Sequence, residues 1–344
     1  MNFIIPLLIF SFSAFARNNS DLRTYRLIGP NSQTMQAVAN RFEVTRRIDD
    51  DFEVIVPNSQ ASAFLQSAPD AQVVNNGKVV EANQSAGYRR FSQVEQELKN
   101  LAAQYPHIAK LETFGQTGGG HKMYALKISD NVQVDEAEPE LMITSATHGD
   151  EIITVEVEMD LINTLLQNYQ KDARLTAMID GKELYFIPMV NPQGYEKRDR
   201  YTQGKDPNRD YPSPLDPTKR SVDCIDLLIK WFHSRDIKGS IDLHASGKLI
   251  MYPWAYTDES PAPADEAIFE TLGNYMAEVN HYRVGQISKI IYVAKGSSAD
   301  YYYWKNRTLA LGIELTSSKA PPFSQVSRVI EESREMLYRF IENF

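Results

Sequence analysis

Apolar and polar positions alternate in short stretches between Arg17 and Asn76, with the period of two that is typical of half-buried strands. Two stretches with helical spacing interrupt this alternation. The predicted order is strand (Thr24–Ile28), helix (Gln33–Phe42), strand (Glu43–Arg47), strand (Phe52–Val56), helix (Ser59–Gln66) and strand (Gln72–Val74). We therefore expect residues 17–76 to fold as a small βαββαβ sandwich domain.

A polar stretch rich in turn-forming residues follows, and we interpret residues 77–90 as a linker. From Phe91 the pattern changes to helices alternating with apolar strands. It begins with an amphipathic helix at Val94–Tyr105 and ends with one at Val326–Asn343. This alternation predicts that residues 91–344 form an α/β domain, with a mixed, mostly parallel sheet covered by helices on both faces.

Four predicted strands of the larger domain are followed by residues whose side chains can take part in catalysis or binding. They are Leu141–Ala146 before His148, Leu184–Val190 before Asn191, Gly239–Leu243 before His244, and Leu309–Ile313 before Glu314. In open α/β sheets, functional sites form at the carboxyl ends of the strands. We therefore expect these side chains to meet at one edge of the sheet.

Composition narrows the possible partners and the compartment. A formal net charge of −9 argues against nucleic acid as a partner, because phosphate binding requires a basic surface. An apolar run that ends in Ala14-Phe15-Ala16 predicts a signal peptide over residues 1–16 and hence export, periplasmic or secreted. We expect no transmembrane segment and a monomer. Cys224, the single cysteine, has no partner for an internal disulfide.

A candidate metal site follows the first of these strands. His148 and Glu151 are three residues apart, and Gly149 between them permits the sharp turn that lets both face one point. Imidazole and carboxylate both suit Zn²⁺, and a catalytic zinc site has three protein ligands with one position open. His244, at a strand end beside small residues, is the best third ligand. The spacing of His148 and Glu151 alone is weak evidence for a metal site, so the assignment depends on the other motifs of the sequence.

Several further motifs occur in a fixed order. They are Asn191-Pro192-Gln193-Gly194, Asp206-Pro207-Asn208-Arg209, Tyr292 ahead of Gly296-Ser297-Ser298-Ala299-Asp300, and Glu314. With His148, Glu151 and His244, they make residues 91–344 resemble the zinc metallocarboxypeptidases of the carboxypeptidase A/B family. The resemblance implies one zinc per chain, held by those three ligands, and peptide or protein C-termini as substrates.

The resemblance also implies roles for other residues. Glu314 matches the general base, and Arg200 matches the arginine that stabilises the oxyanion, with Arg198 as a rival in the same charged loop. Asn208 and Arg209 match the pair that holds the substrate carboxylate. Tyr292 matches the tyrosine that closes over that carboxylate. Asp206 matches the aspartate that orients the first zinc histidine.

The residues that match the specificity pocket are small or apolar. Ala299 stands where an acidic residue would select basic side chains, and the other pocket positions are Met251, Ala255, Ile287, Ala294 and Gly312. Such a pocket favours an apolar or aromatic C-terminal residue, while Lys295 nearby leaves a polar or acidic one as an alternative. Asp150 replaces an arginine of digestive members and Gln193 an aspartate, so secondary substrate contacts are expected to differ.

The N-terminal domain resembles the propeptide of the same family, which shields the cleft until a protease removes it. Lys78, Arg89 and Arg90 offer cleavage points for an activating protease. A permanent accessory domain fits the sequence as well. Two other functions are considered: an exported enzyme that trims cell-wall peptides, and a non-catalytic binding module, which the complete set of site residues opposes.

Overall fold

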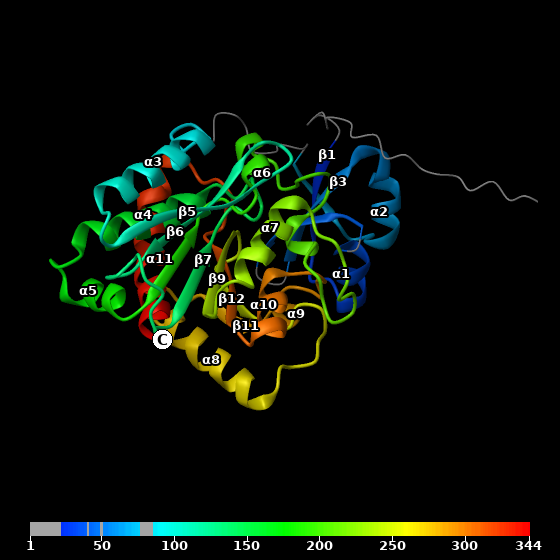
Figure 1. The fold of residues 1–344 in the computed structure, drawn as a ribbon. Helices are drawn as coiled ribbons and strands as arrows, with labels where there is room; N and C mark the ends of the chain where they lie inside the picture. The colour runs from blue at the N-terminus through cyan, green and yellow to red at the C-terminus, as the bar shows by residue number, and fades with distance from the viewer. Residues whose placement is uncertain (1–21, 40, 49–50, 76–84) are drawn as a thin grey trace, which may run out of the picture.

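The computed structural model describes residues 22–39, 41–48, 51–75 and 85–344, which form a small N-terminal domain and a large C-terminal domain (Figure 1). The predicted signal peptide at residues 1–16 and most of the predicted linker, including Lys78, lie outside the described residues. In the part of the chain that is described, no helix combines the length and apolar character needed to cross a membrane.

The N-terminal domain has the predicted βαββαβ order. Its elements are β1 (Leu22–Leu27), α1 (Ser32–Ala39), β2 (Glu43–Ile48), β3 (Asp51–Pro57), the 3-10 turn η2 (Asn58–Gln60), α2 (Ala61–Ser67) and β4 (Gln72–Asn75). The strands pair antiparallel in the order β2-β3-β1-β4. Tyr25, Val54 and Phe64 are buried between the sheet and the helices, which gives this domain a core of its own.

The large domain is built on an eight-stranded sheet in the order β11-β10-β12-β9-β7-β8-β6-β5. The strands are β5 (Ala109–Gln116), β6 (Lys122–Ile128), β7 (Glu140–Thr144), β8 (Glu183–Ile187), β9 (Ile237–Ala245), β10 (Leu249–Tyr252), β11 (Arg283–Gln286) and β12 (Leu309–Leu315). The four central strands β12, β9, β7 and β8 are mutually parallel, so their carboxyl ends share one edge. Antiparallel pairs join β5, β6 and β10 to this centre, so the predicted mixed, mostly parallel sheet is confirmed.

Helices cover both faces of this sheet (Figure 1). They are α3 (Phe91–Gln104), α4 (Ile153–Asn168), α5 (Ala173–Asp180), α6 (Pro192–Lys197), α7 (Asp223–Phe232), α8 (Pro263–Ala277), α9 (Ile287–Ile290), α10 (Ser298–Asn306) and α11 (Val326–Glu342), with 3-10 turns η3 (Pro207–Arg209) and η4 (Phe323–Gln325). Helices α3, α4, α5, α8 and α11 contribute to one apolar core, and α7, α9 and α10 to a second core on the opposite face. Packing on both faces holds the central strands in place, and with them the edge of the sheet at which the site forms.

Helix α3 begins three residues earlier than its apolar periodicity predicts. The backbone N–H of Arg90 donates to Oε1 of Gln93 at 2.8 Å, which completes a capping interaction at the start of the helix. A cap of this kind satisfies backbone donors that the first turn leaves without a partner. The helix therefore extends back to Phe91.

The described end of the predicted linker, residues 85–90, packs against the large domain. The Tyr88 hydroxyl donates to the carbonyl oxygen of Pro321 at 2.6 Å, and the Tyr88 side chain is buried. Arg89 forms ion pairs with Glu97 and Glu156. The carbonyl oxygen of Arg89 accepts hydrogen bonds from Tyr195 Oη and from Arg198, both at 2.7 Å. The carbonyl oxygen of the bond after Arg89 is therefore held by two hydrogen bonds, whereas the Arg90 side chain is exposed.

Candidate active site

The loop after β7 brings the first two candidate ligands together. A Cβ atom added to Gly149 would lie 2.0 Å from the carbonyl carbon of Gly194, so the loop can pack this closely only because residue 149 has no side chain. Gly194 lies in the first turn of α6, where Asn191 caps the helix by accepting from its N–H at 2.9 Å. This contact directs both His148 and Glu151 toward the end of the sheet.

The third candidate ligand and the candidate base lie on neighbouring strands. His244 on β9 and Glu314 on β12 occupy paired positions of the parallel ladder. Residues at paired positions of a sheet project on the same face, so the two side chains lie side by side. The predicted meeting of strand-end side chains is thus confirmed for His244 and Glu314, and His148 lines the same cavity, whereas Asn191 instead caps α6.

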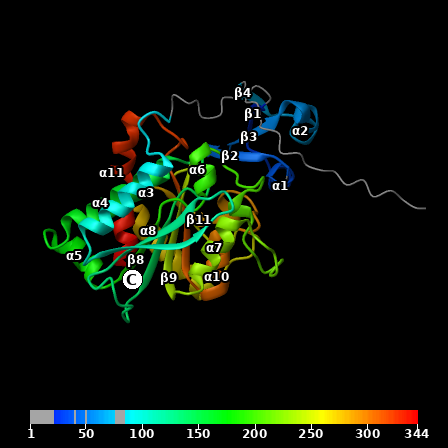
Figure 2. The ribbon, with the colours of Figure 1, turned by 45° about the horizontal axis from the view of Figure 1, so that its top comes forward.

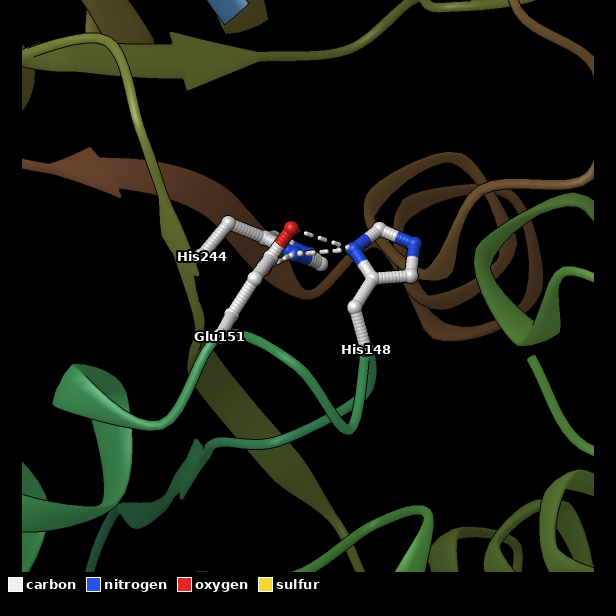
Figure 3. Close-up of side chains that lie close together, drawn as sticks. All are labelled: His148, Glu151 and His244. Carbon is white, nitrogen blue, oxygen red and sulfur yellow. Dashed lines mark hydrogen bonds and ion pairs between the residues drawn. The ribbon is translucent and has the colours of Figure 1, made fainter. Parts of the chain in front are cut away.

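His148, Glu151 and His244 form one compact, buried group (Figure 3). Their exposed fractions are 4%, 2% and 3%. Nδ1 of His148 lies 2.9 Å from Oε1 of Glu151, Nδ1 of His244 lies 3.0 Å from Oε2 of Glu151, and the two Nδ1 atoms are 3.2 Å apart. One ligand atom from each residue lies within 4.8 Å of the others. Two imidazole nitrogens and one carboxylate are a donor set that suits a catalytic zinc ion.

Acidic residues hold the far nitrogens of both imidazoles. Nε2 of His148 lies 3.0 Å from Asp206 Oδ1, and Nε2 of His244 lies 3.1 Å from Asp242 Oδ2. A carboxylate at Nε2 favours the tautomer with its proton there, which leaves the Nδ1 lone pair for a metal ion. The contact of Asp206 agrees with its predicted role. Asp242 was not predicted, although its position two residues before His244 on the same strand places it on the same face.

The pKa values of these groups reflect opposing effects. Burial would raise the pKa of Glu151, but the neighbouring imidazoles His148 and His244 outweigh it and hold that pKa well below its usual range. For Asp206, burial also acts to raise the pKa, and the Arg200 guanidinium and His148 lower it well below normal. Both carboxylates are therefore kept ionised, as metal binding and the orientation of the histidines require.

Glu314 differs from the other carboxylates of the site. Its Oε2 atom is buried and has no hydrogen-bond partner among the described residues. Burial, and then the negative charge of Glu151, raise the pKa of Glu314 above its ordinary value. A carboxylate that is not engaged in a structural contact and has a raised pKa suits proton transfer.

The structure separates the two arginines considered for the oxyanion. Arg200 lines the same cavity as the three candidate ligands. Its guanidinium donates to Asp206 Oδ2, from Nε at 3.0 Å and from Nη2 at 2.8 Å. Arg198 stacks on the ring of Tyr195 and donates to the carbonyl oxygen of Arg89, and it does not line this cavity. Of the two arginines, Arg200 is therefore the one that lines the cavity.

Asn208, Arg209 and Tyr292 form a polar group on another wall of the cavity. Nη2 of Arg209 donates to the Tyr292 hydroxyl at 2.7 Å. Oδ1 of Asn208 accepts from the backbone N–H of Ser298 at 2.9 Å, and its Nδ2 lies 3.0 Å from Nε2 of His244. These contacts place the two predicted carboxylate-binding residues within the cavity that holds the candidate ligands.

The remaining wall of the cavity is apolar. Every pocket residue singled out from the sequence lines it: Met251, Ala255, Ile287, Ala294, Ala299 and Gly312. Leu249 and Ile291 complete this wall and were not predicted. The structure thus brings all the candidate site residues to one cavity, apart from Asp206, which does not line the cavity but contacts Nε2 of His148.

Two residues of the N-terminal domain also line the cavity, Val44 on β2 and Phe52 on β3. Figure 1 and Figure 2 show the N-terminal domain, in blue, lying against one side of the large domain. Nε2 of Gln36 donates to the carbonyl oxygen of Val293 at 3.3 Å, and Tyr292 packs against the core of the N-terminal domain. The small domain therefore lies over the mouth of the cavity.

The fold and the site define the class of protein. Residues 94–336 match the Peptidase M14 family, described as zinc carboxypeptidase, and the chain belongs to that family. The family is zinc-dependent, which agrees with the two imidazoles and one carboxylate of His148, Glu151 and His244.

Individual relatives are similar but distant. A "Zinc carboxypeptidase" of Saccharothrix mutabilis subsp. capreolus is 27% identical over 285 residues, which cover 69% of this chain and 63% of that protein. "Carboxypeptidase D" of Anas platyrhynchos is 25% identical over 291 residues, covering 74% of this chain and 21% of the relative. The chain thus spans less than two thirds of the length of these relatives.

The crystal structure of "the Carboxypeptidase A from Helicoverpa Armigera" has the same fold. It superposes with a TM-score of 0.79 at 16% identity and covers 94% of this chain and 97% of the other. Residues 85–344 make up only about three quarters of the chain. The similarity of fold therefore extends over the N-terminal domain as well as the large one.

Proposed function

We propose that this protein is a zinc-dependent carboxypeptidase that removes the last residue of peptides with an apolar or aromatic C-terminus. The proposal rests on one observation above all. A buried His148–Glu151–His244 group, the carboxylate of Glu314, whose Oε2 has no partner among the described residues, and the guanidinium of Arg209 line a single cavity. This arrangement provides a metal site, a base and a cation for the carboxylate of a chain end.

Each residue has a role in peptide hydrolysis. Zinc, when bound by His148, Glu151 and His244, supplies a Lewis acid that polarises the scissile carbonyl and lowers the pKa of water. Glu314 accepts the proton of the attacking water and passes it to the leaving amine. Arg200, oriented by Asp206, offers a fixed cation to the oxygen on which negative charge develops.

Substrate orientation depends on the opposite end of the cavity. Arg209 and Asn208 bind the terminal carboxylate, and Tyr292 closes over it. The last side chain then lies against Met251, Ile287 and Ala299, where burial of apolar surface contributes about 25 cal/mol per Å². A lysine or aspartate side chain would leave its charge there without a partner.

Metal content and substrate preference test this function together. We expect one zinc per chain, and cleavage of peptides ending in Phe or Leu well ahead of those ending in Lys or Asp. His244→Ala should lose zinc and activity, because a site with two ligands binds zinc weakly. The exposed His107 provides the matched control, and His107→Ala should keep both. A zinc-loaded protein that cleaves none of these peptides even after limited trypsin treatment would overturn the proposal.

The N-terminal domain is proposed to act as an inhibitory propeptide. Val44 and Phe52 line the cavity from above, and the Tyr292 hydroxyl is held on Arg209, the group that a substrate carboxylate needs. A substrate can enter only if this domain moves or is removed. Export through a signal peptide at residues 1–16 is retained as part of the proposal, on the sequence pattern alone.

If the N-terminal domain inhibits the intact chain, a substitution that weakens its docking should raise activity. Val44→Asp should raise its activity about tenfold or more, because a charge buried at the domain contact weakens docking by more than about 1.4 kcal/mol. Val73→Asp, at an exposed position on β4, is the control and should change nothing. Limited trypsin treatment should give a similar rise. Full activity of the intact protein would instead favour a permanent accessory domain.

A further inference from the structure

Lys319 lies in the loop after β12 and reaches the segment that carries two of the candidate zinc ligands. Its Nζ is 2.7 Å from Asp150 Oδ2 and 3.9 Å from Glu151 Oε1. The carbonyl oxygen of Lys319 accepts from the backbone N–H of Ile153 at 3.4 Å, at the start of α4. One residue thus contacts this segment through both its side chain and its backbone.

The ion pair between Lys319 and Asp150 is largely removed from solvent. The exposed fractions of the two side chains are 12% and 13%. Oδ1 of Asp150 is buried and has no hydrogen-bond partner among the described residues, so the contact at Oδ2 is what compensates this carboxylate. A desolvated ion pair of this kind is sensitive to the loss of either partner, because the remaining charge is left buried.

The loop that carries Lys319 is itself held in place. The Tyr88 hydroxyl donates to the carbonyl oxygen of Pro321, and the rings of Tyr88 and Phe323 pack edge to face with centroids 5.4 Å apart. These contacts hold the loop two and four residues after Lys319. A lysine on a loop held in this way can restrain the segment that carries His148 and Glu151.

We propose that Lys319 is a positioning residue for the zinc ligand Glu151, acting through its ion pair with Asp150. This inference rests on the proposed zinc site. His148, His244 and Arg200 approach the Glu151 carboxylate from within the cavity, whereas Lys319 approaches it from the loop after β12. Groups that orient metal ligands in this way typically change metal affinity by about 10–100-fold when they are removed.

A purely electrostatic effect of Lys319 would have the opposite sign. A cation near the site repels Zn²⁺, so its removal alone would strengthen zinc binding through Coulomb's law. Removal of both Lys319 and Asp150 would remove a neutral pair and leave zinc affinity nearly unchanged. Loss of positioning, in contrast, weakens zinc binding in both cases. The direction of the change therefore distinguishes the two effects.

The test compares zinc dissociation constants of the full chain, measured by competition with a chelating dye, and kcat/KM at saturating zinc after limited trypsin treatment. We expect K319M and the double variant D150N/K319M each to bind zinc about tenfold more weakly than the unmutated protein. K319R should stay close to it, because the pair is kept. K99M, which breaks the exposed pair of Lys99 with Glu95, is the matched control and should have no effect.

Circular dichroism of the zinc-free proteins checks folding. If K319M does not fold, the double variant decides the question, because it leaves no unpaired buried charge. Unchanged or tighter zinc binding by the double variant, or by a folded K319M, overturns the role of Lys319. If the unmutated protein itself binds no zinc and cleaves no peptide after limited trypsin treatment, the proposed function fails instead, so the two failures are distinguishable.

Discussion

Glu314→Gln is expected to lower kcat/KM for a good peptide substrate by about 10²–10⁴-fold, the range typical for loss of a general base. Glutamine has nearly the same shape as glutamate but cannot accept the proton of the attacking water. The three candidate ligands remain, so zinc content and thermal stability should be those of the unmutated protein. The loss should appear in kcat rather than in KM, because Glu314 acts in the transition state.

The control for this experiment is a glutamate away from the cavity. Glu278 is largely exposed, at 65% of its side-chain surface, and Glu278→Gln should leave kcat/KM unchanged. Zinc per chain must be measured on the same samples, so that loss of metal is not mistaken for loss of the base. Turnover within a few-fold of normal in zinc-loaded Glu314→Gln would refute the role of this residue.

Arg209→Ala is expected to reduce kcat/KM on peptides with a free terminal carboxylate by about 10²–10³-fold. Loss of one partner of a buried, charge-assisted pair costs about 2–5 kcal/mol, and each 1.4 kcal/mol is a factor of ten. C-terminally amidated peptides, which lack the negative charge, should be affected much less. The preference for a free chain end should therefore largely disappear.

Lysine at the same position provides an informative comparison. Arg209→Lys keeps the charge but lacks the planar fork that matches a carboxylate, so only part of the activity should return. The unmutated protein sets the reference for both variants. If it already cleaves an amidated peptide as fast as the free acid, selection of chain ends by Arg209 is wrong.

The sequence predicted the arrangement of the site well for residues that lie at the carboxyl ends of strands. His148, Asn191, His244 and Glu314 each follow or end a strand, and parallel strands bring their carboxyl ends to one edge whatever the details of packing. The N-terminal domain was predicted equally well, because its elements are short, local and separated by turn-forming residues. Element boundaries shifted by up to three residues, and at Arg90 a local hydrogen bond accounts for the shift.

Contacts between distant segments could not be predicted in the same way. Lys319 is more than 160 positions from Asp150 along the chain, and no periodicity indicates that the loop after β12 returns to the ligand segment. Phe52 has the pattern of an ordinary core residue, and its place at the cavity depends on how two domains dock. Arg89 looked exposed because its neighbours are polar, but its partners Glu156 and Tyr195 come from remote helices.

The tight packing of Gly149 limits how this metal site can diverge or be redesigned. Of the four residues His148, Gly149, Asp150 and Glu151, two are candidate ligands, and Gly149 has no room for even a methyl group. Only position 150 is open to substitution without loss of the site or a backbone clash. A search for enzymes with altered metal affinity should therefore vary residues 150 and 319 together and leave the other three positions unchanged.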